Sequence, residues 1–219
     1  MSAGLLQESA GERLPMPDAE LLWWPRIDLG RSNDLVLRDL VDSCAWRQEE
    51  IKVYGKAYRQ PRLSAWYGDQ GYSYSGIRLE PTPWSPLLLD IKARVQQLAG
   101  HEFNSVLLNY YRDEHDRMGM HSDDERELGP RPVIASLSIG ETRTLLFRHR
   151  TRKDIKTVKL ELPDGSLLLM RGDTQRYWRH GINAERSPCG ARVNLTFRSI
   201  DPEAHRTSGA TQATTGLLS

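Results

Sequence analysis

The sequence has few cysteines and lacks a long apolar run. Its 219 residues contain two cysteines, Cys44 and Cys189, which lie far apart and outside any CxxC pattern. This usage argues against a disulfide framework or a zinc ribbon and favours a reducing compartment. No stretch approaches the roughly 18 consecutive apolar residues of a membrane helix, and residues 1–15 lack a basic start followed by an apolar run. We therefore expect no membrane span, no secretory signal and a cytoplasmic location.

The sequence also has almost no excess of one sign of charge. Lys and Arg total 30 against 29 Asp and Glu, which gives a formal net charge of +1. The overall charge therefore does not indicate a nucleic-acid-binding protein. Locally, "FRHRTRK" at residues 147–153 is strongly basic. Such a run suits either the tip of a charged hairpin or contacts to phosphate groups.

The order of the periodic segments predicts one α+β domain. Residues 32–46 and 85–100 carry apolar residues at helical spacing, and the second segment offers Ser85 as a cap, Pro86 in the first turn and Gly100 at the end. After Gly100, short alternating runs separated by Gly, Pro and Asp predict strands of a sandwich or barrel. We expect residues 19–202 to form a single domain, with disordered segments at 1–18 and 203–219.

The stretch "GMHSDDEREL" at residues 119–128 places a histidine beside several carboxylates. In an extended segment, His121 and Asp123 project to the same face, so both side chains can bind one ion. A third ligand must come from a distant strand, and His180 in "QRYWRHGINA" is the candidate. Two imidazoles and one carboxylate leave positions open on the ion, as in non-haem Fe(II) oxygenases. The alternative is a solvated acidic turn with a surface histidine.

The segment "RVNLTFR" at residues 192–198 alternates strictly between polar and apolar residues. One face carries Arg192, Asn194, Thr196 and Arg198. Two arginine forks on one strand suit a small dicarboxylate, and the outward polar face of a sheet is the alternative. The segment "NSVLLNYYRDE" adds Asn109 and Tyr111 on one face of another strand. These two residues are either neutral donors to a carboxylate or parts of an ordinary half-buried strand.

Taken in order, "NYYRDEHDRMGMHSDDE", "PVIASLSIGETRTLLFR", the lone His180 and "RVNLTFR" resemble the AlkB family of Fe(II)/2-oxoglutarate-dependent nucleic-acid dealkylases. The similarity covers about residues 50–201. It implies a double-stranded β-helix (jelly-roll) core over about 104–201, with N-terminal helices and a nucleotide-recognition lid over about 50–80.

The same resemblance implies a set of cofactor-binding residues. Fe(II) would be held by His121, Asp123 and His180. Arg198 would bind the 1-carboxylate of 2-oxoglutarate. Arg192 would bind the far carboxylate, helped by Asn109 and Tyr111, with Asn194 nearby. O2 is the second co-substrate that this family implies.

For the nucleic acid, the resemblance points to aromatic residues and one carboxylate. Tyr72 and Tyr74 match positions beside an extruded base, Trp66 is a further candidate, and Glu125 matches a position that hydrogen-bonds an exocyclic amine. Tyr54 in "VYG" is similar to the finger that fills the gap left by a flipped base. Core packing is the alternative for any one of these aromatic residues. We expect the phosphate contacts to come from local arginines: Arg62, Arg148, Arg150 and Arg152.

The implied reaction is oxidative demethylation of 1-methyladenine and 3-methylcytosine in DNA, single- or double-stranded, with release of formaldehyde, succinate and carbon dioxide. RNA is left open as a substrate, and we expect a monomer. Such lesions are cationic and cannot pair, which favours aromatic stacking and lowers the cost of base flipping. Other hypotheses stay open: an iron oxygenase acting on a protein or lipid, or a non-catalytic nucleic-acid-binding relative. A zinc hydrolase is less favoured, because the general-base Glu of H-E-x-x-H is missing.

Overall fold

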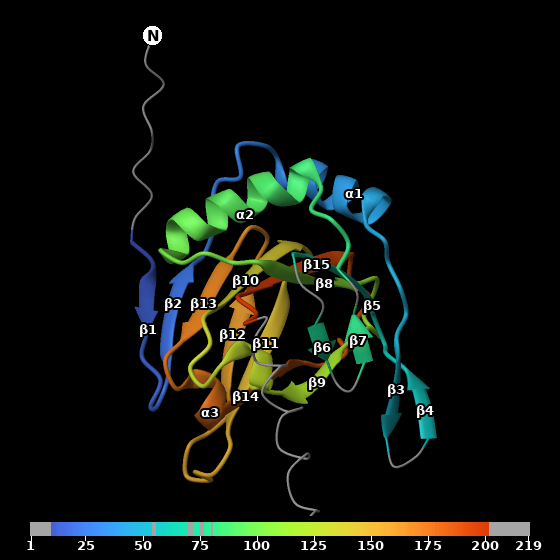
Figure 1. Cartoon of the computed structure of the whole chain (residues 1–219). Helices are drawn as coiled ribbons and strands as arrows, with labels where there is room; N and C mark the ends of the chain where they lie inside the picture. Colours follow the sequence, from blue (N-terminus) through green and yellow to red (C-terminus); the bar gives the residue numbers. More distant parts are fainter. Residues whose placement is uncertain (1–9, 54–55, 70–71, 75–76, 80, 202–219) are drawn as a thin grey trace, which may run out of the picture.

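The computed structural model describes residues 10–53, 56–69, 72–74, 77–79 and 81–201. Two antiparallel sheets face one another, and two helices cover the outer side of the larger sheet (Figure 1). The larger sheet has the strand order β1 (Glu12–Leu14), β2 (Glu20–Trp24), β13 (Leu167–Arg171), β10 (Ile134–Gly140), β15 (Arg192–Arg198), β8 (Ser105–Tyr111), β5 (Leu63–Gly68). The smaller sheet has the order β12 (Val158–Leu162), β11 (Arg143–His149), β14 (Trp178–Ile182), β9 (Met118–His121). This arrangement confirms the predicted α+β fold with a jelly-roll core.

Shorter elements complete the chain. The predicted lid region contains two hairpins, β3 (Glu50–Val53) with β4 (Lys56–Arg59) and β6 (Tyr72–Tyr74) with β7 (Ile77–Leu79). The helical elements are α1 (Asn33–Ser43), α2 (Pro86–Ala99), the short α3 (Thr174–Tyr177) and the 3-10 turn η1 (Arg126–Leu128). No helix of the described residues is both long and apolar enough to cross a membrane.

Both predicted helices are present and begin at capping serines. Ser32 Oγ accepts the backbone N–H of Leu35, and Ser85 Oγ accepts that of Leu88. Gly100 ends α2 with a φ of 60°, a conformation that glycine adopts without strain. The start of each helix was therefore predictable from its capping serine, and the structure shows the corresponding hydrogen bond.

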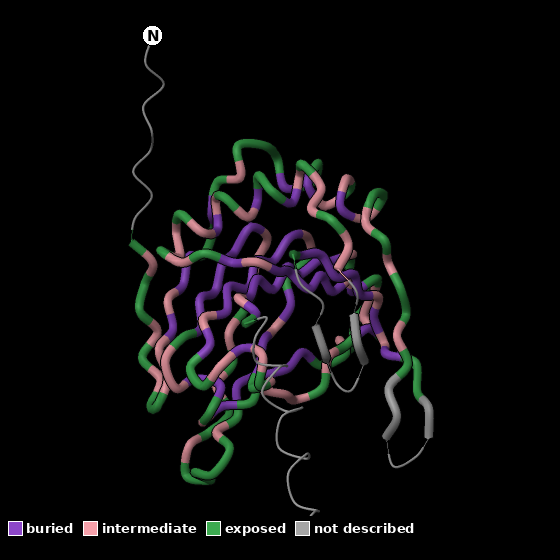
Figure 2. The backbone as a smooth tube through the Cα atoms, in the orientation of Figure 1, coloured by how far each residue is buried: buried purple, intermediate pink, exposed green. Residues whose placement is uncertain are grey.

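The alternation along the central strands separates two apolar layers. One layer lies between the helices and the larger sheet and includes Leu40, Val95 and Leu195. The other lies between the two sheets and includes Phe147 and Trp178. Every residue of β15 is buried (Figure 2). Because its apolar side chains pack in the layer on the helix side, its polar face points into the interior between the sheets. The alternative of a solvent-facing polar strand is therefore wrong.

Two predicted boundaries need correction. Within the segment 1–18 that was expected to be disordered, Glu12–Leu14 forms β1 and pairs with the apolar strand β2, and residues 1–9 lie outside the described residues. The jelly-roll core also extends before residue 104, since β2 pairs with β13 and β5 pairs with β8. Residues 203–219 lie outside the described residues.

Candidate metal and co-substrate site

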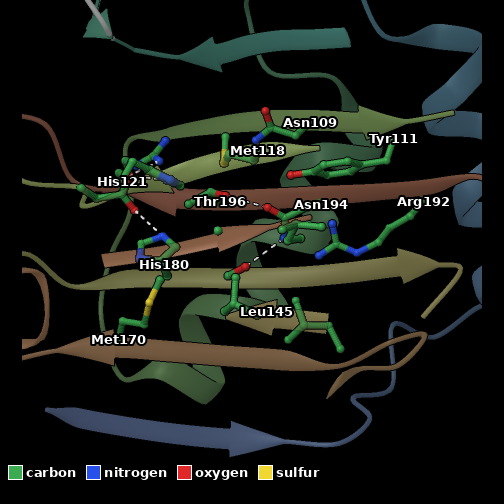
Figure 3. Close-up of a pocket in the computed structure, with 16 residues that line it drawn as sticks. Asn109, Tyr111, Met118, His121, Leu145, Met170, His180, Arg192, Asn194 and Thr196 are labelled. Carbon is green, nitrogen blue, oxygen red and sulfur yellow. Dashed lines mark hydrogen bonds and ion pairs between the residues drawn. The ribbon is translucent and has the colours of Figure 1, made fainter. Parts of the chain in front are cut away.

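The three predicted metal ligands meet at one point between the sheets (Figure 3). His121 ends β9, and the pairing of β9 with β14 places His180 directly opposite it. The Nε2 atoms of His121 and His180 each lie 3.9 Å from an oxygen of Asp123. The candidate ligand atoms all lie within 4.8 Å of one another. Because Asp123 and His180 are buried, the alternative of a solvated acidic turn is wrong.

The protonation states suit a divalent cation. Burial lowers the pKa of His180 to about 3 and also lowers the pKa of His121, so both imidazoles are neutral near pH 7. Burial by itself would raise the pKa of Asp123. The charge of Arg198 and the hydrogen bond that Arg198 donates outweigh it, and the pKa of Asp123 is lowered to about 2. The site therefore offers two neutral nitrogen donors and one carboxylate anion.

The orientation of the donors also fits a metal. His121 Nδ1 lies 3.0 Å from the carbonyl oxygen of Gly119 and therefore carries the proton, which leaves the lone pair on Nε2. Asp123 Oδ1 accepts a hydrogen bond from Arg198 Nη2 at 2.7 Å. Asp123 Oδ2 is buried and has no hydrogen-bond partner in the described part of the chain. A buried carboxylate oxygen without a donor is costly, and a cation beside it removes that cost. The residues present thus fit Fe(II) held by two histidines and one carboxylate.

The residues predicted to bind 2-oxoglutarate line the same pocket. The pairing of β15 with β8 places Arg192 opposite Tyr111 and Asn194 opposite Asn109. With Arg198, these side chains and the three metal ligands surround one cavity (Figure 3). The polar faces of two neighbouring strands therefore form the wall of a pocket that reaches the candidate metal position.

Arg192 is a buried cation that lacks an anionic partner among the described residues. Its Nη2 donates to Ser138 Oγ at 2.9 Å, whereas Nε and Nη1 have no hydrogen-bond partner there. Its guanidinium lies over the ring of Tyr111, 5.0 Å from the centroid. Burial lowers the pKa of Arg192 to about 10, so the group is still charged at neutral pH. The carboxylate of a small ligand would supply the missing partner.

Arg62 is not a surface phosphate contact, and this prediction was wrong. Its side chain is buried, and its Nε donates to Asn109 Oδ1 at 2.7 Å. Because Oδ1 of Asn109 already accepts this bond, Nδ2 is the atom of that amide able to donate to a carboxylate. Arg62 therefore contacts a residue that lines the co-substrate pocket and sets the orientation of Asn109.

The predicted base-contacting residues have different outcomes. The prediction that Trp66 contacts the base was wrong, because its side chain packs in the apolar layer between the sheets and is only 5% exposed. Glu125 is partly buried and follows Asp123 by two residues, immediately before η1. Tyr54 lies outside the described residues. Tyr72 and Tyr74 belong to β6, but their side chains are outside the description.

The basic run 147–153 spans the end of β11 and the loop that follows it. Arg150 Nη1 lies 2.7 Å from Asp124 Oδ2, and Arg152 Nη2 lies 2.7 Å from Asp154 Oδ2. Both arginines are thus paired with carboxylates. Arg148 is exposed and lies directly opposite Arg179 on β14. Arg179 was missed because only the strand register brings it next to Arg148.

Comparisons with known proteins agree with this geometry. Residues 30–198 match the family model of the 2OG-Fe(II) oxygenase superfamily. The chain is 42% identical over 195 residues to the alpha-ketoglutarate-dependent dioxygenase alkB homolog 3 of Rattus norvegicus, covering 85% of this chain and 66% of that protein. It is 44% identical over 161 residues to the DNA oxidative demethylase ALKBH2 of Mus musculus, covering 70% of this chain and 67% of that protein.

A solved structure supports the fold as well. The structure of OsALKBH1 aligns with a TM-score of 0.58 at 17% identity, covering 85% of this chain and 99% of that one. The chain spans slightly less than two thirds of the length of the alkB homolog 3 proteins that it matches.

Proposed function

We propose, since this chain belongs to the AlkB family of the 2OG-Fe(II) oxygenase superfamily, that it is an oxidative demethylase of N-alkylated bases in DNA. The proposed lesions are 1-methyladenine and 3-methylcytosine, and the products are the repaired base, formaldehyde, succinate and carbon dioxide. The observation that carries this proposal is one pocket that joins a His-Asp-His ligand set to two buried arginines, Arg192 and Arg198. A dicarboxylate and a divalent metal would meet in that pocket.

The residues of the pocket have separate proposed roles in binding the metal and the co-substrate. His121, Asp123 and His180 would hold Fe(II), which when bound supplies the oxygen chemistry that oxidises the methyl group. Arg198 fixes the Asp123 carboxylate and would bind the 1-carboxylate of 2-oxoglutarate. Arg192 and Tyr111, with Asn109 and Asn194, would bind the far carboxylate and so orient the co-substrate.

On the substrate side, Glu125 is proposed to hydrogen-bond the exocyclic amine of the flipped base. Its position two residues after Asp123 would place the alkylated edge of the base close to the metal. Stacking by Tyr72 and Tyr74 and insertion of Tyr54 stay predictions. The choice between DNA and RNA, strand preference, the monomeric state and the cytoplasmic location stay predictions too.

The phosphate contact that the structure favours is Arg148 together with Arg179. Like charges directly opposite in an antiparallel pair repel each other. Within the described residues, neither side chain has a hydrogen bond or ion pair. A phosphodiester group bound by both guanidinium groups would turn this repulsion into two charge-assisted contacts.

Replacing both residues, Arg148→Gln with Arg179→Gln, is expected to weaken binding of a single-stranded 1-methyladenine oligonucleotide. The slope of log K against log salt should become shallower by about 0.7, because the two arginines together neutralise one phosphate and each neutralised phosphate contributes about 0.7. Fluorescence anisotropy over a salt series measures this slope. Arg186→Gln removes an exposed arginine elsewhere and serves as the control. An unchanged slope in the double variant would remove both residues from the interface.

The proposed activity is tested by mass spectrometry of a 1-methyladenine oligonucleotide incubated with the protein, Fe(II), ascorbate and O2. Loss of one methylene mass only when 2-oxoglutarate is present is the expected result. The same assay on single-stranded DNA, duplex DNA and RNA ranks the substrates. Succinate formation without demethylation would favour an oxygenase of another substrate, such as a protein or lipid. If neither succinate nor the demethylated oligonucleotide forms, the proposed iron site is refuted.

A further inference from the structure

Gln175 is a buried polar residue with no role in the chemistry described above. It lies on α3, between β13 and β14, and is 1% exposed. Its Oε1 accepts the backbone N–H of Asp123 at 3.0 Å. Its Nε2 makes a weaker contact, 3.5 Å long, to the sulfur of Met170, which also lines the pocket. The strong hydrogen bond of this side chain is therefore directed at a residue that supplies a metal ligand.

Arg150 connects the same two segments from the surface. Its Nη1 donates to Asp124 Oδ2 at 2.7 Å and, over a longer distance of 3.4 Å, to the backbone oxygen of Gln175. Its backbone N–H donates to the carbonyl oxygen of Tyr177 at 2.8 Å. The loop that carries Asp123 is thus tied to α3 at two consecutive residues, once inside the protein and once at its surface.

The location of α3 gives these contacts a consequence for the metal. The strand β14, which carries His180, begins directly after α3. A contact between α3 and Asp123 therefore fixes the spacing of two ligands that are distant in sequence. Without the Gln175 acceptor, the buried N–H of Asp123 would lack a partner, and the peptide would have to turn to find one. Such a rotation would move the Asp123 carboxylate, now 3.9 Å from His180 Nε2.

We propose that Gln175 is a positioning residue for the metal ion. Its side-chain oxygen holds the Asp123 backbone and so keeps the Asp123 carboxylate aligned with both histidines. The inference rests on the assignment of His121, Asp123 and His180 as ligands, and it is independent of the identity of the substrate. Outer contacts of this kind are typically worth about 10- to 100-fold in metal affinity.

The test is a titration of the metal-free full-length protein with Co(II), followed by its visible absorption. In Gln175→Met, which lacks the acceptor and has a similar volume, the Kd for Co(II) is expected to rise about 10- to 100-fold. The Co(II) absorption bands are expected to change because the ligand geometry changes. Gln175→Glu keeps an acceptor oxygen at the same reach and is expected to recover most of the affinity.

Gln96 provides a matched control. Its Oε1 accepts the backbone N–H of Phe103 at 2.8 Å, at the other end of the molecule on α2. Gln96→Met is therefore expected to lower the melting temperature and to leave the Co(II) affinity and spectrum unchanged. The proposal is overturned if Gln175→Met binds Co(II) like the unmodified protein, or changes no more than Gln96→Met does.

A second variant keeps the test decisive if Gln175→Met does not fold. Arg150→Met removes the surface half of the same connection and is expected to weaken Co(II) binding a few-fold; unchanged affinity would then count against the proposal. The titration contains neither nucleic acid nor 2-oxoglutarate. A failed demethylation assay would therefore not change the measured Co(II) affinities. An unchanged Co(II) affinity in Gln175→Met would in turn not count against demethylation.

Discussion

His121→Ala is expected to abolish both metal binding and demethylation while the protein stays folded. The variant lacks one of the two neutral nitrogen donors, and the buried Asp123 carboxylate keeps its bond to Arg198. The imidazole ring is partly exposed, and its hydrogen bond to Gly119 spans only two residues. We expect a loss of about 1 kcal/mol in stability, from this hydrogen bond, and a melting temperature lower by about 2–4 °C.

Asp123→Asn should give the same loss of activity at a much larger cost in stability. The substitution removes the negative charge beside Arg198, whose side chain is 2% exposed. Breaking a buried ion pair from one side typically costs about 3–5 kcal/mol. Thermal denaturation and Co(II) titration of the two variants separate the effects. Wild-type Co(II) affinity in His121→Ala would show that the ion is held elsewhere.

Two of the three metal ligands were predictable from one local rule, and the third was not. An H-x-D pair has both side chains on one face only if the segment is extended, and β9 ends at His121 as this rule requires. The position of His180 depended on the pairing of β9 with β14, which no spacing rule gives. Its assignment before the structure therefore depended on the resemblance to a family.

The arginines show where sequence reasoning reached its limit. Alternation along "RVNLTFR" separated the two faces of β15 but did not show that the smaller sheet covers the polar one. Arg62 and Arg150 read alike as basic surface residues. The structure buries the first against Asn109 and pairs the second with Asp124. Burial and long-range ion pairs depend on which strands become neighbours, and a single strand's pattern does not encode that choice.

The predictions for Trp66 and for the first strand were wrong for a related reason. Trp66 follows the alternation of β5, but the pattern alone does not distinguish a core-facing aromatic ring from one that lines a substrate groove. Residues Glu12–Leu14 have a polar, short sequence, and they form a strand because β2 provides an edge for pairing. In both cases a tertiary neighbour decided the outcome.

Two buried arginines that lie over the same tyrosine ring have different surroundings. Arg192 and Arg143 lie over the ring of Tyr111, with distances of 5.0 and 5.5 Å to its centroid. Arg143 donates to Glu185 at 3.1 Å and, through Nη2, to the carbonyl oxygen of Asn183 at 2.7 Å. Its charge and donors are thus satisfied by the protein. Arg192 has a neutral serine hydroxyl as its hydrogen-bond acceptor among the described residues.

Arg192→Met is expected to raise the KM for 2-oxoglutarate by at least about 30-fold. Truncating one partner of a buried charge pair costs about 2–5 kcal/mol of binding, and about 1.4 kcal/mol is a factor of ten. Because the variant removes a buried cation that lacks an anion, the melting temperature of the ligand-free protein should not fall. Added 2-oxoglutarate should raise the melting temperature of the unmodified protein and not that of the variant.

Arg143→Met is the matched control, with the opposite expected sign. It leaves Glu185 and several carbonyl oxygens without their donor, so the ligand-free protein should be strongly destabilised. If Arg192→Met instead lowers the melting temperature as much as Arg143→Met and keeps the KM, Arg192 is a structural cation and the carboxylate binds elsewhere. If the melting temperature falls in Arg143→Met and does not fall in Arg192→Met, burying Arg192 destabilises the ligand-free protein. A bound dicarboxylate would then supply the anion that offsets this destabilisation.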